Sequence, residues 1–145
     1  MQSISRILRA ALPFVAFVLV ACGAPSDTDL FQKLSALAEK GSAAAQYNLG
    51  MLYNNGIGTA QDTHRAFEWF EKSAAGGDPL GSYKVGCYYA GQFPGVVPID
   101  YEKALEANLV AAKAGYFRAQ QEIAGMYASK DNFQEAVKWW TAAAD

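Results

Sequence analysis

The chain has 145 residues, enough for one domain with a hydrophobic core. It is 52% apolar and only 18% charged, which excludes a disordered, highly charged tail. Its 12 lysines and arginines are outnumbered by 14 aspartates and glutamates, whereas nucleic acids are bound largely through Lys and Arg contacts to phosphate. The composition therefore argues against a nucleic-acid partner.

The first 21 residues have the pattern of an export signal. Arg6 and Arg9 give a positively charged start, and an uncharged, mostly apolar run follows from residue 10 to residue 21. This run is too short for a membrane-spanning helix, which needs about 20 apolar residues. We therefore expect residues 1–21 to be removed as a signal peptide.

The apolar run ends in Leu-Val-Ala-Cys at positions 19–22. These four residues resemble the lipobox of bacterial lipoproteins, in which the cysteine thiol receives a diacylglyceryl group and the chain is cut just before it. The resemblance implies that Cys22 anchors the protein to a membrane through lipid, followed by a tether at 22–28. Gly23 in place of Asp favours the outer membrane, facing the periplasm. The alternative is an ordinary secretory signal in which Cys22 occurs by chance.

Residues 29–40 are predicted to form a helix that caps the segments after it. Its apolar residues recur at helical spacing, and Ser26 or Thr28 could cap its N-terminus. The apolar positions are Leu30, Phe31, Leu34, Leu37 and Ala38. We expect this face to cover the first of the repeats described next, because end repeats need covering.

Three similar segments start at Gly41, Gly77 and Gly115, spaced by 36 and then 38 residues. In each, an apolar residue, a small residue and a tyrosine fall at the ninth, tenth and thirteenth positions. These sets are Leu49, Gly50 and Tyr53; Val85, Gly86 and Tyr89; and Ile123, Ala124 and Tyr127. Self-similarity at this period is the signature of a helical repeat protein.

A second helical segment follows in each repeat, beginning at Ala66, Ala104 and Ala136. The combined pattern, with Trp69 three residues after Ala66, resembles the Sel1-like repeat, a relative of the tetratricopeptide repeat. The resemblance implies an all-α, right-handed α-solenoid of about three helix-turn-helix repeats, at 41–76, 77–114 and 115–145, the last short and incomplete. The second repeat departs from the pattern, because Ala107 stands where Trp is expected.

Several residues predict where these helices end and how they pack. Asp62, Asp100 and Asp131 precede the second helices, where Asp can cap free amides. Gly41, Gly77 and Gly115 are suited to helix C-termini. Small residues at 45, 50, 66 and 74 would let paired helices approach closely, with aromatic residues filling the remaining space. Near the C-terminus, we expect Trp139 and Trp140 to pack inward.

Reactive groups are scarce, so the sequence favours a binding protein over an enzyme. The one histidine, His64, is expected on a solvated surface, and no metal-ligand spacing or cofactor motif occurs. Apart from Cys22, Cys87 is alone and is expected to be a buried thiol. A cysteine-rich branch of the family is linked to β-lactams, but this chain lacks the paired cysteines, so that activity is not inferred.

Partner contacts in the family usually come from the first helix of each repeat, which lines the concave side of the solenoid. The corresponding positions here are Tyr47, Met51, Asn54 and Asn55; Leu80, Tyr83 and Cys87; and Arg118, Gln121 and Ser129. Stacked Tyr47, Tyr83 and Gln121 would suit an extended peptide or a partner's helix. The alternative is that these residues serve only packing between repeats.

We therefore expect a membrane-anchored adaptor in the bacterial cell envelope that binds a protein or peptide in its concave groove, without a cofactor. One alternative is a periplasmic regulator of a membrane sensor protein. A second is an enzyme acting on a cell-wall component or a β-lactam. The sequence does not identify the partner.

Overall fold

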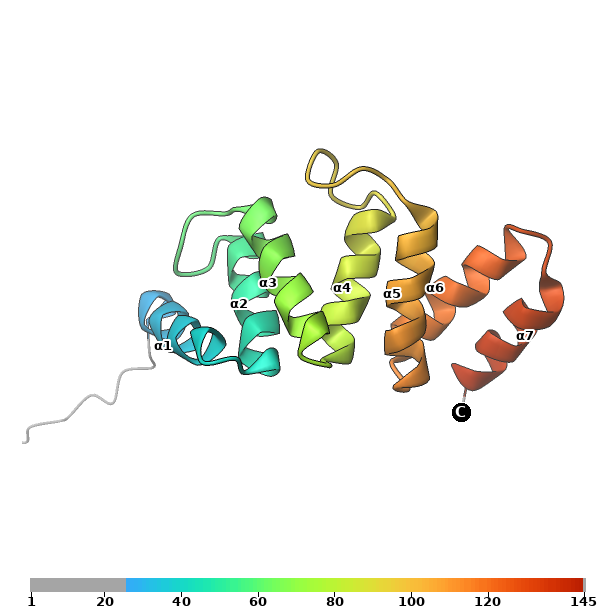
Figure 1. Cartoon of the computed structure of the whole chain (residues 1–145), viewed down its shortest axis with the longest axis horizontal. Coiled ribbons are helices and arrows are strands. Elements are labelled where there is room, and N and C mark those ends of the chain that lie inside the picture. Colours follow the sequence, from blue (N-terminus) through green and yellow to red (C-terminus); the bar gives the residue numbers. More distant parts are fainter. Residues whose placement is uncertain (1–25, 145) are drawn as a thin grey trace, which may run out of the picture.

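The computed structural model describes residues 26–144, which form seven helices and no strands. The helices are α1 (Asp27–Glu39), α2 (Ala43–Asn55), α3 (Thr63–Ala75), α4 (Pro79–Tyr89), α5 (Tyr101–Lys113), α6 (Phe117–Ala128) and α7 (Phe133–Ala142). Each helix packs against the next along the chain, so the protein is an elongated stack (Figure 1). The expected all-α solenoid is confirmed. The predicted signal peptide and Cys22 lie outside the described residues.

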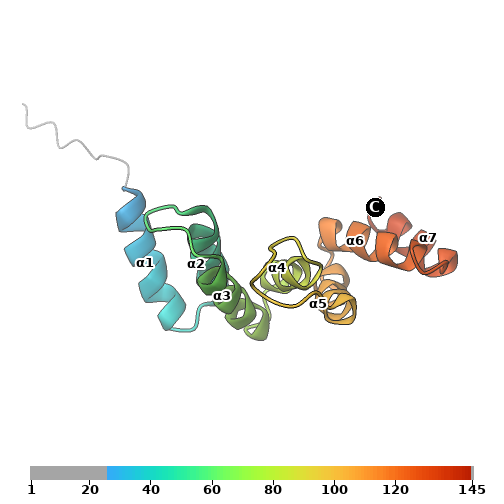
Figure 2. The ribbon, with the colours of Figure 1, turned by 90° about the horizontal axis from the view of Figure 1, so that it is seen from above.

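The stack follows a shallow arc when seen from above (Figure 2). Helices α3 and α5 lie towards the outer side of this arc, and α2, α4 and α6 lie towards the inner side. The loops within repeats gather at one edge of the stack, and the tight turns between repeats gather at the opposite edge (Figure 1).

Helix α1 packs on the first repeat, as expected for a capping helix. Its Ala38 is buried in a cluster with Leu49 of α2, against which Phe31 also packs. The helix begins at Asp27, two residues earlier than predicted. The reason is a capping box, in which the Ser26 hydroxyl accepts from the Asp29 amide while the Asp29 carboxylate accepts from the Ser26 amide.

The turns between repeats use one geometry. Gly41, Gly77 and Gly115 adopt φ angles of 89°, 85° and 84°, a left-handed conformation that residues with a Cβ rarely adopt. Two backbone hydrogen bonds close each turn; at the first, the Gly41 amide donates to Ala38 (3.0 Å) and the Ser42 amide donates to Leu37 (3.2 Å). The three predicted helix stops are therefore confirmed.

The predicted N-terminal caps of the second helices are confirmed in two repeats, and the prediction is wrong in the third. Asp62 and Asp100 accept hydrogen bonds from the first-turn amides of α3 and α5. In the third repeat Asn132, not Asp131, caps α7. Asp131 instead takes the left-handed conformation, with φ of 56°, that glycine adopts in the other turns. The shorter connection there places Asp131 at the turn, and Asp tolerates this conformation better than most residues.

Paired helices approach closely where the sequence has small residues. A Cβ at Gly50 would lie 2.7 Å from a Phe70 ring carbon and 3.1 Å from the Ala66 carbonyl oxygen, so only glycine allows this spacing of α2 and α3. A Cβ at Gly86 would lie 2.6 Å from Asn108 Oδ1. Asn108 replaces the phenylalanine of the first repeat, and its buried Oδ1 has no hydrogen-bond donor among the described residues.

Two buried glutamines, not predicted from the sequence, join the first and third repeats to the helices that precede them. Gln46 Nε2 donates to the Ala38 carbonyl (3.1 Å), and Gln120 Nε2 donates to the Ala112 carbonyl (3.2 Å). Each acceptor lies at the end of the preceding helix, where backbone carbonyls lack partners within the helix. Each acceptor also receives the amide hydrogen of the turn glycine, Gly41 or Gly115, so the side chain adds a second hydrogen bond to a carbonyl at the helix end.

The two C-terminal tryptophans behave differently. Trp139 is half-buried and packs against the cluster that contains Ala112 and Ile123, so inward packing is confirmed for it. For Trp140 the prediction is wrong, because 47% of its side chain is exposed. Trp140 corresponds to Phe70, which is covered by Tyr88 of the following helix, and no helix after α7 is described.

Replacing Gly50 with alanine is expected to lower the free energy of unfolding by about 1–3 kcal/mol, because the new methyl group overlaps the Phe70 ring. Gly125→Ala in α6 is the matched control, since a Cβ there meets nothing within 4 Å. This control should be neutral or raise stability by up to about 1 kcal/mol through helix propensity. Urea denaturation measures both. Equal effects of the two substitutions would contradict the close approach of α2 and α3.

Candidate partner-binding surface

On α2, the predicted contact residues Tyr47 and Met51 are only half-exposed. Tyr47 lies against Phe70, with 5.8 Å between ring centroids, and both residues pack on the cluster between the first and second repeats. Burial raises the pKa of Tyr47 above its ordinary value, so its phenol stays neutral and able to donate a hydrogen bond. These two residues serve packing first and offer only part of their surface to a partner.

Of the two asparagines at the end of α2, one serves packing and the other is accessible. The Tyr88 hydroxyl donates to Asn54 Oδ1 (2.9 Å), which joins α2 to α4. Burial raises the pKa of Tyr88 to about 12, so the donor keeps its proton at neutral pH. Asn55 is exposed and donates to the Met51 carbonyl (2.9 Å). Asn54 is therefore a structural residue, and Asn55 remains accessible.

On α4, the structure corrects the assignment of Tyr83 and Cys87 to the groove. Tyr83 is 9% exposed and Cys87 is 3% exposed. The Tyr83 ring packs against Tyr116, with 4.9 Å between centroids, because the third repeat covers this face of α4. Cys87 is the buried thiol that the sequence predicted, and burial raises its pKa. The expected strip of Tyr47, Tyr83 and Gln121 is therefore interrupted at its centre, and Leu80 is half-buried.

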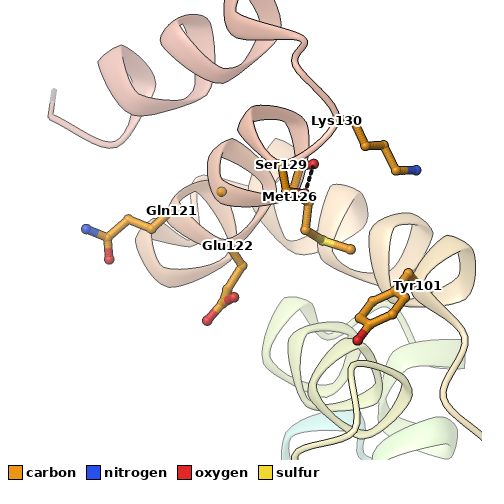
Figure 3. A pocket seen from close by; sticks show the side chains of 7 residues that line it. Tyr101, Gln121, Glu122, Met126, Ser129 and Lys130 are labelled. Atoms are coloured by element: carbon orange, nitrogen blue, oxygen red, sulfur yellow. Dashed lines mark hydrogen bonds between the residues drawn. The ribbon is translucent and has the colours of Figure 1, made fainter.

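The predicted contact residues of α6 are the accessible ones. Arg118, Gln121 and Ser129 are all exposed. Gln121 and Ser129 line a pocket of about 360 Å³ between α6 and the start of α5, called here the α6 pocket (Figure 3). Its other lining residues are Tyr101, Glu122, Gly125, Met126 and Lys130. Reasoning from repeats missed Tyr101, because it enters the pocket from the preceding helix pair and has no periodic signal.

The α6 pocket combines apolar surface with a polar rim. Tyr101 and Met126 supply the apolar surface, while Glu122 and Lys130 place opposite charges around it (Figure 3). The space beside Gly125 is open, since a Cβ at this position would meet nothing within 4 Å. The Ser129 hydroxyl already donates to the Met126 carbonyl (2.8 Å). This arrangement can hold an apolar side chain of a peptide while the rim groups bond to its backbone.

Two features are absent from residues 26–144 and their helices. None of these helices is long and apolar enough to cross a membrane. Within the same range, no three His, Cys, Asp or Glu side chains gather in a way that could hold a metal ion. His64 is exposed, as the sequence predicted.

The repeats have clear relatives among known proteins. The Sel1 repeat family matches residues 43–78, 79–106 and 119–145, together more than half of the chain. The chain belongs to the Sel1 repeat family. Sel1 repeats are protein-interaction scaffolds and are typically not enzymes. A Sel1-like repeat-containing protein of Acanthamoeba polyphaga mimivirus is 33% identical over 103 residues, which are 70% of this chain and 18% of the viral protein.

Several solved structures share the fold. A Sel1 repeat protein from Oxalobacter formigenes superposes with a TM-score of 0.76 and 27% identity, over 82% of this chain and 49% of that one. A protective antigen of uropathogenic Escherichia coli superposes with a TM-score of 0.71 and 34% identity, over 79% of this chain and 25% of the antigen. MamA superposes with a TM-score of 0.55 and 27% sequence identity, over 81% of this chain and 67% of MamA. The chain thus spans less than half of the length of each of the first two structures.

The bond between Tyr88 and Asn54 predicts a pH dependence of stability. Because the folded state raises the pKa of Tyr88, an unfolded chain loses this proton near pH 10 while the folded chain keeps it to about pH 12. The part of the stability that Tyr88 contributes should therefore be intact below pH 10 and be lost as pH rises towards 12. Tyr47, Tyr83 and Cys87, whose pKa values burial also raises, add further losses at alkaline pH. Tyr88→Phe should make the alkaline fall in stability shallower by the share of Tyr88, and at neutral pH it should cost about 1 kcal/mol for the lost hydrogen bond.

Urea denaturation at a series of pH values measures this prediction. Tyr101→Phe is the matched control at neutral pH, because the Tyr101 side chain is 60% exposed and should contribute little. A Tyr88→Phe variant with wild-type stability at neutral pH and an unchanged fall above pH 10 would contradict the proposed contact.

Proposed function

We propose that this Sel1 repeat protein is an adaptor of the bacterial cell envelope that binds a protein or peptide partner. The observation that carries the proposal is the α6 pocket, where Gln121 and Ser129, two positions chosen from the family's contact pattern, lie beside exposed Tyr101. Apolar surface with a rim of hydrogen-bonding groups suits a peptide better than an ion or a nucleic acid. The overall acidic composition supports the same conclusion.

Anchoring to a membrane is the second part of the proposal. It is supported by the charged start, the short apolar run and the Leu-Val-Ala-Cys sequence that ends at Cys22. Lipid on Cys22 would hold the solenoid at the periplasmic face of the outer membrane, with Gly23 favouring that membrane over the inner one. Several acyl chains together give stable attachment, whereas one alone binds only reversibly.

The partner site is tested by crosslinking and affinity capture from native membranes. A Tyr101→Ala, Gln121→Ala variant removes two exposed side chains of the α6 pocket and should still fold, as circular dichroism would verify. We expect it to recover at least tenfold less of the partner than the wild type, the loss that about 1.4 kcal/mol produces. The control is Gln32→Ala, Gln134→Ala, which changes two exposed glutamines elsewhere. Undiminished capture by the pocket variant would place the contact on another surface.

The identity of the captured protein decides between two roles. An assembly of envelope proteins would support the adaptor. A membrane sensor protein would support a periplasmic regulator instead. Failure of the wild type to capture any partner would contradict both roles.

The anchor is tested separately by metabolic labelling with radioactive palmitate and by membrane fractionation. We expect the wild type to carry label and to sediment with membranes, and Cys22→Ser to lose both properties because it lacks the thiol that is acylated. Cys87→Ser is the matched control and should keep both, since Cys87 is buried in the solenoid. Wild-type protein without label would contradict the anchor and favour an ordinary secretory signal.

A further inference from the structure

A second cavity, of about 400 Å³, lies between α3 and α5 over α4, and it is called here the α4 cavity. Helices α3 and α5 lie towards the outer side of the arc (Figure 2). It is lined by Ala74, Ser82, Val85, Tyr89, Lys103, Glu106, Ala107 and Val110. A volume of this size is within the range of pockets that hold ligands, roughly 300–1,000 Å³.

The repeat pattern explains why this cavity exists. Position 107 of the second repeat corresponds to Trp69 of the first and Trp139 of the third. Trp69 packs on the cluster of Ala38, Ala45 and Leu49, and Trp139 packs on the equivalent cluster two repeats further along. In the second repeat an alanine takes this place, so the space that an indole ring fills in both neighbours is left open.

The apolar walls of the α4 cavity resemble the surroundings of Trp69. Ala74, Val85 and Tyr89 correspond to Ala38, Leu49 and Tyr53, which lie in the Trp69 cluster. Lys103 lies 5.2 Å from the centre of the Tyr89 ring, as Arg65 lies 5.7 Å from that of Tyr53. Two lining positions differ: Ser82 replaces Gln46, and Val110 replaces Lys72, whose Nζ lies 3.9 Å from the centre of the Trp69 ring. The apolar wall that accepts an indole in the first repeat is preserved in the second.

A polar group in the cavity also suits an indole. Ser82 lies at the position of Gln46, is only 3% exposed, and donates its hydroxyl hydrogen to the Asp78 carbonyl (3.2 Å). Its oxygen keeps lone pairs that can accept the indole N–H, and a buried indole usually finds such a partner. The shorter serine leaves more room than the glutamine of the first repeat.

We propose that the α4 cavity binds a tryptophan side chain presented by a partner protein, which completes the second repeat as Trp69 and Trp139 complete theirs. The inference rests on the proposed binding function and adds to it a second site, which shares no lining residue with the α6 pocket. The occupant is a protein side chain because both equivalent positions in this chain hold an indole carried by a polypeptide. Tryptophan is also among the residues that contribute most to protein interfaces.

The test is a titration of the ¹⁵N-labelled full chain with a capped pentapeptide, Gly-Gly-Trp-Gly-Gly, followed by NMR. We expect saturable shifts of the amides of Ala74, Val85 and Ala107, with a dissociation constant on the order of 1 mM, as befits one buried side chain. The same peptide with alanine in place of tryptophan should cause none of these shifts.

Two tryptophan variants make the test specific. Ala107→Trp fills the cavity from within, and it should fold because positions 69 and 139 already accommodate this side chain. We expect it to weaken peptide binding at least tenfold. Ala36→Trp adds a tryptophan on the exposed surface of α1 and should leave binding unchanged.

Three results would overturn the inference: no saturable shifts, equal binding by Ala107→Trp, or shifts that map away from the cavity. A second titration uses free indole in place of the peptide. If it binds more tightly than the peptide, the occupant is a small aromatic molecule and the assignment to a partner protein is wrong. Capture of a partner through the α6 pocket is measured independently, so either proposal can fail while the other stands.

Discussion

The solenoid depends on how closely the two helices of a repeat can approach. At Gly50 the backbone of α2 lies against the Phe70 ring and the Ala66 carbonyl, with no space for a methyl group. The same contact recurs at Gly86, where Asn108 replaces the ring. Close packing of this kind lets the neighbouring aromatic residues fill the remaining volume, and that filling supplies most of the stabilisation of a thin, elongated protein. The glycine turns between repeats connect one tightly packed helix pair to the next.

Much of this fold could be predicted from the sequence, because repetition makes each feature visible three times. The helix stops at Gly41, Gly77 and Gly115 and the cap at Asp62 follow from local backbone chemistry, and the structure confirms them. The predicted contact surface was less reliable, because exposure depends on which helix covers which face. Tyr83 and Gln121 occupy equivalent positions, yet α6 and its neighbours bury the first while the second is exposed. The entry of Tyr101 into the α6 pocket arises from tertiary packing and has no counterpart in the repeat pattern.

The second repeat is the one that departs most from the family pattern, and its departures lie on different sides of α5. Ala107 faces the α4 cavity, whereas the neighbouring Asn108 faces Gly86 in the interior. Both substitutions replace a large aromatic residue of the first repeat with a smaller one. One leaves apolar space at the surface, and the other leaves a buried oxygen without a donor among the described residues. In a repeat protein, where each unit contacts only its neighbours, such changes alter one unit and leave the others intact.

The separation of turns and loops onto opposite edges has a consequence for how this architecture can vary (Figure 1). The loop from Ala90 to Asp100 is longer than the connection from Ser129 to Asn132, yet both join helices that stack in the same manner. Length added at this edge projects away from the helices and leaves their spacing unchanged. Ancestral insertions, epitope tags or grafted recognition peptides could therefore be accommodated there, while the tight glycine edge would tolerate none of them.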